Sequence, residues 1–399
     1  MGKIDRIENE VILHGRRNNQ AWFEPRIGVI PGDGKHKDSE VFIVTTLLTG
    51  NDIGPVFFLK TGDLGRTWTP PMLSQKWHKN PIDDDVFEEP WLGPTHHKKT
   101  GKLIAIGGTH FVRDKGTESS LKNEHHFSDP NLCNSIAYSV WSSDNNDFDA
   151  WKKLKMPKNL QLGVYYAGQR HECNDGTILI PGYYRSVSNK TSDSNYWNIT
   201  VLRCSFDGSE LQYIEHGSIH TVEEKRGLAE PSLIYFQGRY FMTIRHDLRG
   251  YVTTSFDGLH FDELKVWMFD DGTELGSYNT QQHWLKHNNM LYLVYTRKNE
   301  LSNGVVRDRA PLFMAEVDSD TLQVRRATEQ IVFPEKEARM GNFSVVNVTD
   351  NESWIITGEW LQGMFSHSKK GKRFWADSKS FNYIQYIGDL LLARVYWKN

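Results

Sequence analysis

The residues best able to do chemistry stand at the ends of a short predicted hairpin. Glu230 opens an apolar run, a tight turn follows at residues 237–238, and Arg245 and His246 close the second run. In an antiparallel pair, the start of one strand lies beside the end of the next. We therefore expect Glu230 and Arg245 to meet at one edge of a sheet. A carboxylate held there could take part in acid–base catalysis.

The same unit recurs along the chain. Apolar residues alternate with polar ones between Gly, Asn, Asp and Pro turns, and no long window has a helical period. The first strands of six such units begin near Phe23, Glu89, Gln169, Glu230, Gln281 and Gly341. Six repeats of four short strands predict an all-β fold, a six-bladed β-propeller. A seventh blade between residues 110 and 168 is the alternative that the pattern leaves open.

The two ends of the chain favour a closed ring. Residues 5–13 resemble the outer strand predicted at 324–332, and residues 389–395 resemble the third strand predicted at 310–317. We expect the N-terminal strand to complete the last blade, which removes an open sheet edge. Residues 1–399 are then predicted to form one propeller domain.

The composition of the chain gives no support for several classes of partner and cofactor. The net charge of −3 gives no electrostatic case for nucleic acid or an acidic membrane. No apolar run approaches the roughly 20 residues that span a bilayer. The three cysteines form no C-x-x-C pair, so neither a disulfide framework nor a zinc site is predicted. No cofactor is predicted, although a structural calcium ion would leave little trace in sequence.

The sequence leaves the location of the protein open. It begins without a signal peptide. That start is compatible with a cytoplasmic protein, and equally with a secreted or periplasmic one whose leader has been removed.

Polar residues at the starts of first strands and the ends of second strands converge on one face of a propeller. Several arginines brought together there repel one another unless they meet an anion, so an acidic sugar is a fitting ligand. The alternative is that each arginine pairs with a carboxylate between blades. The residues expected to bind substrate at this rim are Arg26, Gln169, Arg170, Arg185, Arg245, Gln282, His283, Arg309, Arg339 and Asn342.

Three stretches carry a family resemblance. Residues 23–27 read Phe-Glu-Pro-Arg-Ile, Glu230 and Arg245 bracket a hairpin, and residues 61–68 form the turn Thr-Gly-Asp-Leu-Gly-Arg-Thr-Trp. With these motifs the chain resembles the sialidase superfamily, the Asp-box (BNR-repeat) propellers, over nearly its whole length. The resemblance implies an exo-acting glycoside hydrolase for a terminal acidic sugar.

The resemblance also implies roles for individual residues. Arg26, Arg245 and Arg309 would grip the carboxylate of the sugar. Asp52 would be the general acid, and Glu230 a base or the partner of another nucleophile, which meets the two-carboxylate requirement of glycoside hydrolysis.

The last blade departs from the family pattern. A sialidase has a nucleophilic tyrosine there, activated by the glutamate, whereas residues 339–344 read Arg-Met-Gly-Asn-Phe-Ser. The sequence therefore predicts the fold but does not predict retaining hydrolysis of sialic acid by the usual route.

Two further interpretations stay open. Propeller polysaccharide lyases of the ulvan and rhamnosyl-glucuronate type are similar to this chain. In that case His110, Tyr166 and His246 are candidates to abstract the proton beside a uronate carboxylate that Arg185 neutralises. The third interpretation is a lectin-like propeller that binds an acidic glycan without cleaving it. In every case the partner is an oligosaccharide or polysaccharide.

Overall fold

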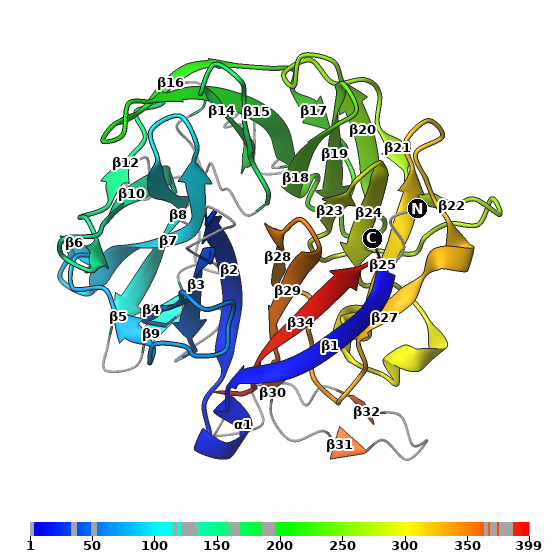
Figure 1. Ribbon diagram of the computed structural model, residues 1–399, viewed down its shortest axis with the longest axis horizontal. Coiled ribbons are helices and arrows are strands. Elements are labelled where there is room, and N and C mark those ends of the chain that lie inside the picture. Colours follow the sequence, from blue (N-terminus) through cyan, green and yellow to red (C-terminus); the bar gives the residue numbers. More distant parts are fainter. Residues whose placement is uncertain are drawn as a thin grey trace.

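The structure is a computed structural model. It describes residues 4–32, 38–48, 54–114, 118–120, 134–157, 160, 168–185, 196–362, 366–367, 373–374 and 386–398. These residues form six mainly antiparallel blades around a central axis, the predicted six-bladed β-propeller (Figure 1). In the described part of the chain, no helix has the length and apolarity needed to cross a membrane.

The first two blades take up the N-terminal part of the chain after the first strand. The strands of blade 1 are β2 (Trp22–Ile30), β3 (Glu40–Leu47), β4 (Val56–Thr61) and β5 (Met72–Leu73). Those of blade 2 are β6 (Asn80–Asp83), β7 (Val86–His97), β8 (Lys102–Asp114), β9 (Glu118–Ser120), β10 (Ile136–Ser142), β11 (Asp147–Phe148) and β12 (Lys152–Lys153). The stretch in which a seventh blade was the alternative thus supplies the outer strands of blade 2.

Blades 3 and 4 follow in chain order. Blade 3 contains β13 (His171–Glu172), β14 (Ile178–Arg185), β15 (Trp197–Phe206), β16 (Leu211–His216) and β17 (His220–Thr221). Blade 4 contains β18 (Ala229–Phe236), β19 (Arg239–Arg245), β20 (Tyr251–Ser255) and β21 (Lys265–Val266). Strands β13 and β18 are the innermost strands of these two blades, so their starts face the central axis at one rim.

Blades 5 and 6 complete the ring. Blade 5 contains β22 (Met268–Phe269), β23 (His283–His287), β24 (Met290–Tyr295), β25 (Leu312–Asp318), β26 (Gln323–Val324) and β27 (Gln330–Phe333). Blade 6 contains β28 (Phe343–Thr349), β29 (Glu352–Gly358), β34 (Leu390–Trp397) and β1 (Ile4–Leu13). The short elements between blades are α1 (Gly15–Asn18), η5 (Glu300–Ser302), η6 (Val306–Asp308), η7 (Arg326–Thr328) and the two-residue strands β30 (Leu361–Gln362), β31 (Ser366–His367), β32 (Arg373–Phe374) and β33 (Tyr386–Ile387).

The predicted closure of the ring is confirmed. Strand β1 runs antiparallel to β34, with Val11 opposite Leu391, so the two ends of the chain share blade 6 (Figure 1). Arg394 strengthens this seam through contacts with Glu10 at 2.7 Å and Glu352 at 3.1 Å. Pairing the terminal strands satisfies the backbone groups that an open edge would expose.

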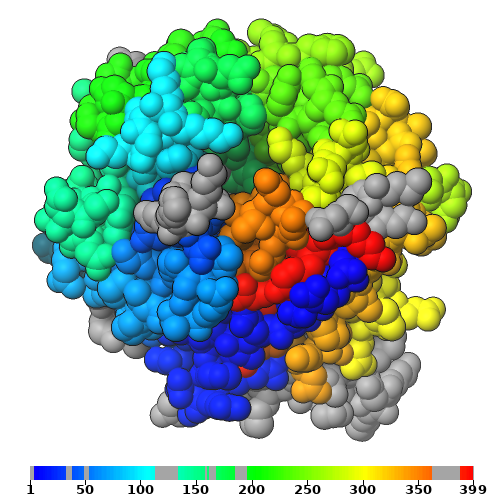
Figure 2. Space-filling view, viewed as in Figure 1, coloured from blue at the N-terminus to red at the C-terminus, as the bar shows by residue number. Residues whose placement is uncertain are grey.

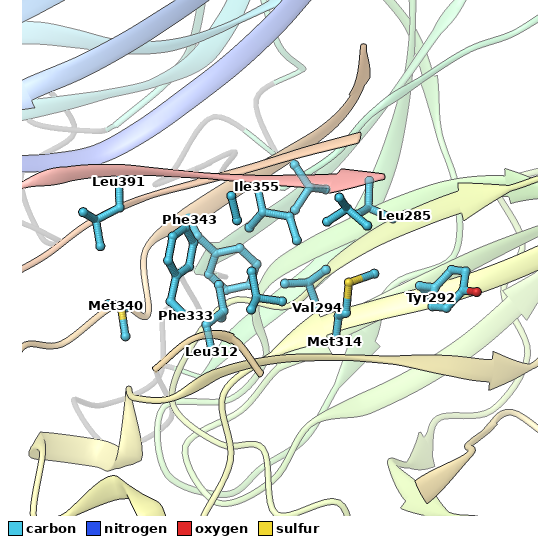
Figure 3. Packing of buried hydrophobic residues seen from close by; sticks show 14 of the residues in the cluster. Leu285, Tyr292, Val294, Leu312, Met314, Phe333, Met340, Phe343, Ile355 and Leu391 are labelled. Carbon is cyan, nitrogen blue, oxygen red and sulfur yellow. The ribbon is translucent and has the colours of Figure 1, made fainter. Parts of the chain in front are cut away.

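Apolar side chains between blades 5 and 6 fix the rim segments that precede their strands. Leu312, Phe333, Phe343 and Ile355 belong to one buried cluster between the two sheets (Figure 3). Phe343 is fully buried, which contributes about 1.5–3 kcal/mol relative to exposure. Since Asn342 and Arg309 lie one and three residues before buried members of this cluster, the packing holds the backbone that carries both.

Asp63 organises the turn at residues 61–68 through its side chain. The Asp63 carboxylate accepts hydrogen bonds from the backbone N–H and the hydroxyl of Thr67, at 3.0 and 2.6 Å, and from the Thr61 hydroxyl at 2.7 Å. These bonds to Thr67 and Thr61 lower the pKa of Asp63 to about 2. The turn follows a third strand, so it lies at the opposite end of the blade from the rim.

Candidate functional site

The centre of the candidate site is the pair formed by Glu230 and Arg245. A bulge between Ala229 and Ser232 interrupts the pairing of β18 with β19, and Ala229 lies opposite Arg245. Glu230 has a φ of 46° in this bulge, a conformation that non-glycine residues seldom adopt. Its Oε1 lies 2.6 Å from Nη1 of Arg245, so the predicted meeting of these two residues is confirmed.

Three more arginines come from other blades. Arg309 precedes β25 and is buried, while Arg26 lies in β2 with its side chain 12% exposed. Arg339 precedes β28 and stacks on Trp360, with its guanidinium carbon 3.8 Å from the ring centre. Blades 1, 4, 5 and 6 therefore each supply one arginine to this part of the rim.

Asn279 joins two of these arginines. Its Oδ1 accepts a hydrogen bond from Nη2 of Arg245 at 2.7 Å, and its backbone carbonyl accepts one from Nη2 of Arg309 at 2.8 Å. Asn279 has a φ of 51°, and its N–H donates to the carbonyl of His246 at 2.8 Å. Gly341 allows the close approach of Arg309, because a Cβ there would lie 2.6 Å from the Cδ of that arginine.

The electrostatics of the group favour an anion. Burial, together with the guanidinium groups of Arg245, Arg339 and Arg307, lowers the pKa of Arg309 to about 9. Burial acts to raise the pKa of Glu230, but Arg245, with smaller contributions from other arginines, holds it below its usual value. Glu230 is therefore ionised at neutral pH, and its buried Oε2 has no hydrogen-bond partner among the described residues.

A second carboxylate lies on the same rim in blade 1. Glu24 is buried and, like Glu230, has a φ of 46° within a bulge. Its Oε1 accepts a hydrogen bond from Nδ2 of Asn342 at 2.9 Å, and its Oε2 lies 4.0 Å from Nη2 of Arg26. Asn342 lies in the segment where the family resemblance places a nucleophilic tyrosine. Its amide contacts Glu24 there.

His110 forms a separate pair with a carboxylate in blade 2. Its Nε2 lies 2.8 Å from Oε1 of Glu89, the residue opposite it in the β7–β8 register. The ring meets Trp91 edge-on at 6.1 Å, and Arg26 lies over Trp91 at 5.5 Å. His110 is thus connected to the arginine group through one shared tryptophan.

The other predicted residues of blades 4 and 5 have structural partners. His246 uses both ring nitrogens in contacts with the backbone, at 3.0 Å to the Glu224 carbonyl and 3.3 Å from the Leu248 N–H. Gln282 bonds Ser277 and is fully buried. His283 lies beneath the site, where burial and then Arg26 lower its pKa to about 3. These contacts give no reason to assign proton transfer to His246 or His283.

Gln169 and Arg170 join blades near the axis. Gln169 donates to the carbonyl of Trp284 at 2.9 Å, and its Oε1 accepts from the hydroxyl of Ser232 at 3.0 Å. Arg170 donates to the backbone carbonyls of Gly93 and Ile106, at 2.6 and 3.2 Å. Both residues were predicted to bind substrate, but these contacts are bridges between blades.

Three predictions fall outside what the structure describes. Asp52 and Tyr166 lie outside the described residues, and so does the side chain of Arg185. The described residues contain no group of three or more His, Cys, Asp or Glu that could hold a metal ion.

The sequence alone did not identify Asn279, Glu24 or Tyr183. Asn279 lies in an irregular segment without a motif, and only its left-handed backbone marks it. Glu24 could have been found, because Glu24-Pro25 repeats the Glu-Pro pair of Glu230. Tyr183 of β14 is near enough to contribute to the raised pKa of Arg245, although burial opposes that rise and Glu230 is its larger cause.

No protein-family model matches the sequence, and a search of curated proteins finds no match either. Among solved structures, a protein of unknown function from Dyadobacter fermentans DSM 18053 aligns with a TM-score of 0.64 at 12% identity, over 99% of this chain and 100% of that one. The phage phi92 endosialidase aligns with a TM-score of 0.55 at 14% identity, over 99% of this chain and 70% of the other.

The Trypanosoma rangeli sialidase, solved in complex with sialic acid, aligns with a TM-score of 0.59 at 12% identity, over 98% of this chain. The match spans 59% of the length of that enzyme. At these identities the likeness concerns the fold alone: the chain is a six-bladed propeller whose fold is similar to that of these sialidases.

Proposed function

We propose that the protein is a glycoside hydrolase that releases a terminal sugar bearing a carboxylate. The observation that carries the proposal is the buried Glu230, paired with Arg245 through one oxygen while the other oxygen has no hydrogen-bond partner among the described residues. An ionised carboxylate with one oxygen that has no hydrogen-bond partner among the described residues, surrounded by arginines, can act on a bound anionic sugar.

The arginines supply the binding half of the proposal. Arg245 and Arg309 share Asn279, and both are buried beside a single ionised glutamate. A sugar carboxylate would neutralise part of this charge and form bidentate contacts with guanidinium groups. Arg26 would complete the clamp from the opposite side of the ring, since its charge also acts on Glu230.

Water is the proposed nucleophile. The amide of Asn342 cannot attack the sugar, and it is occupied with Glu24. Glu230 would take a proton from water as the C–O bond of the glycoside breaks, and a general acid would protonate the departing oxygen. Asp52 is the proposed acid on the family resemblance. A single displacement by water inverts the anomeric configuration of the released sugar.

The test is a panel of sialylated and uronate-containing glycans, with released sugars followed by chromatography and unsaturated uronate by ultraviolet absorbance. The expected result is release of an acidic sugar without new absorbance, with activity lost in Glu230→Gln. Glu329→Gln is the matched control, because Glu329 also pairs with an arginine, Arg297, at 2.7 Å but in the outer part of blade 5.

The product configuration tests the role of water separately. Proton NMR of freshly released sugar should show the inverted anomer. A retained anomer would contradict direct attack by water and would require a covalent intermediate. Tyr183→Phe would then show whether the tyrosine near Arg245 forms it.

One observation favours a second candidate, a polysaccharide lyase. His110 is oriented by Glu89 and is linked through Trp91 to Arg26. A histidine held this way could take the proton beside a uronate carboxylate, with the electron pair forming a carbon–carbon double bond as the glycosidic C–O bond breaks. Sugar release accompanied by the ultraviolet absorbance of an unsaturated uronate, with both lost in His110→Gln, would establish elimination. That result would overturn the proposed hydrolase.

A further inference from the structure

A cavity of about 390 Å³ runs along the axis of the propeller. All six blades line it, from Arg26 in β2 to Lys286 at the end of β23 and Asn347 in β28. Its lining follows the first strands from their middle to their ends, so it reaches the face opposite the candidate site. Figure 2 shows the molecule hollowed near its centre, beside the orange surface of β28 and β29. We call this space the axial cavity.

The axial cavity is lined by basic side chains. Its charged or ionisable lining residues are Arg26, His96, Lys98, Arg170 and Lys286, and no described lining residue is Asp or Glu. Burial, and after it Lys98, lowers the pKa of Lys286. The same two lysines act on His171, whose pKa falls to about 4 mainly through burial. Lys98 and Lys286 both line this cavity, so their two ammonium groups belong to the same mouth.

The carboxylate of Glu172 bonds backbone groups and forms no described ion pair with the ammonium groups of Lys98 and Lys286. The two oxygens of Glu172 accept hydrogen bonds from the backbone N–H groups of Lys98 and Lys99, at 2.7 and 2.9 Å. Lys286 donates from Nζ to the carbonyl of Tyr235 at 3.0 Å. Within the described part of the chain, neither ammonium group of Lys98 and Lys286 forms an ion pair. Two ammonium groups without a paired carboxylate attract an oxyanion, because an anion relieves the repulsion between the two cations.

A second space continues from the mouth of the axial cavity. This side groove has a volume of about 660 Å³ and shares Pro31, Lys286, Asn347 and Val348 with the axial cavity. Amide side chains are frequent along it, from Gln237, Asn288, Asn347 and Asn351. Tyr235 adds an aromatic ring that is 37% exposed. Amides and an exposed aromatic ring suit the hydroxyls and apolar faces of sugar rings.

We propose that this face carries a second glycan-binding site, separate from the candidate active site, for an anionic oligosaccharide. The carboxylate or sulfate of one sugar lies between Lys98 and Lys286 at the mouth of the axial cavity. The neighbouring sugar rings lie in the side groove against Tyr235 and the amides. The site does not depend on cleavage, because it uses neither Glu230 nor Arg245.

Titration calorimetry on the full chain carrying Glu230→Gln tests the site. The probes are sialyllactose, an oligosaccharide of alternating glucuronate and N-acetylglucosamine, neutral lactose and sodium sulfate. With at least one acidic probe, we expect one binding event to vanish in Lys98→Gln/Lys286→Gln. Losing two charge-assisted hydrogen bonds should weaken it by about 100-fold. Lys265→Gln/Lys336→Gln removes two exposed lysines elsewhere and should leave it unchanged.

Tyr235→Ala separates a glycan site from a site for small anions. It should weaken the acidic oligosaccharide about tenfold and leave the weaker binding of sulfate unchanged. The proposal is overturned if no acidic probe depends on the two lysines, or if sulfate binds as tightly as the best oligosaccharide. Binding that depends on Lys98 and Lys286 but persists in Arg309→Met would support this site even if the proposed hydrolysis failed.

Discussion

Glu24 in blade 1 and Glu230 in blade 4 occupy the same place in their blades, but their carboxylates have different partners. Both precede a proline, both have a φ of 46°, and both lie in a bulge of a first strand. Blades 1 and 4 are three apart in a ring of six, so the two residues lie on opposite sides of the axis. The backbone therefore presents two equivalent carboxylates to one rim.

The difference comes from the neighbouring strand. Near Glu230, the second strand of the blade ends in Arg245, which contacts the carboxylate at 2.6 Å. At the corresponding point of blade 1, Phe23 lies opposite Thr46, and the amide of Asn342 contacts Glu24 instead. A guanidinium keeps its glutamate ionised, whereas a neutral amide mainly orients its partner. We infer that blade 4 supplies the reacting carboxylate and that Glu24 positions Arg26.

The largest expected effect separates these two roles. Glu230→Gln should lower kcat about 10²–10⁴-fold, since it removes the general base. Glu24→Gln should cost about tenfold or less, mainly in KM, because it weakens one contact with Arg26. Steady-state kinetics on the acidic glycan identified by the panel measures both. If Glu24→Gln lost as much kcat as Glu230→Gln, the roles assigned to the two blades would be wrong.

The repeat and the backbone of the rim could be predicted from sequence, because alternating apolar residues and turn residues determine them locally. The blade count, the closure by β1 and the meeting of Glu230 with Arg245 depend on such patterns. Partners from different blades could not be predicted in the same way. The contact of Asn279 with two arginines and the contact of Asn342 with Glu24 depend on how whole blades pack against one another. The same packing directs the side chain of Arg170 toward backbone carbonyls of blade 2.

A variant of Arg309 tests whether the arginines around Glu230 carry a positive charge that no carboxylate neutralises. Burial and neighbouring arginines lower its pKa to about 9, so its charged form is disfavoured in the folded protein. Arg309→Met should weaken an acidic sugar about 100-fold while raising the Tm by about 2 °C. Arg297→Met is the control, because Arg297 is paired with Glu329 and its loss should lower the Tm without affecting binding. A lower Tm in Arg309→Met would contradict an unneutralised charge.

The acidic limb of the pH profile tests the ionisation of Glu230. Arg245 holds the pKa of Glu230 below its usual value despite burial, which acts to raise it. Activity should therefore persist as the pH falls below the ordinary glutamate range and be lost only as Glu230 becomes protonated. The stability that this ion pair contributes depends on pH in the same direction as the activity. It is fully present above the pKa of Glu230 in the unfolded chain and is lost as the pH falls through the pKa of Glu230 in the folded protein. Arg245→Gln should move the acidic limb of kcat/KM to higher pH.

Asn279 gives the smallest and most specific effect. Its Oδ1 holds Arg245 and its backbone carbonyl holds Arg309, so its side chain fixes the geometry of the clamp without touching the reacting atoms. Asn279→Gly removes the Oδ1 contact but tolerates the φ of 51°, so the backbone and the carbonyl contact should persist. The same Oδ1 also accepts a hydrogen bond from Nη2 of Arg226 at 3.0 Å, so the variant loses two charged hydrogen bonds, of which only the one from Arg245 belongs to the clamp. Losing that bond predicts a rise in KM of about tenfold with kcat nearly unchanged.

Asn303→Gly is the matched control for that variant, since Asn303 has a φ of 47° after η5 and lies in an exposed part of blade 5. It should leave KM unchanged. An equal fall in kcat and kcat/KM for Asn279→Gly would mean that Arg245 is needed chiefly in the transition state. In that case Arg245 would act on Glu230 more than on the sugar carboxylate, and the contrast between blades 1 and 4 would lie in catalysis and not in binding.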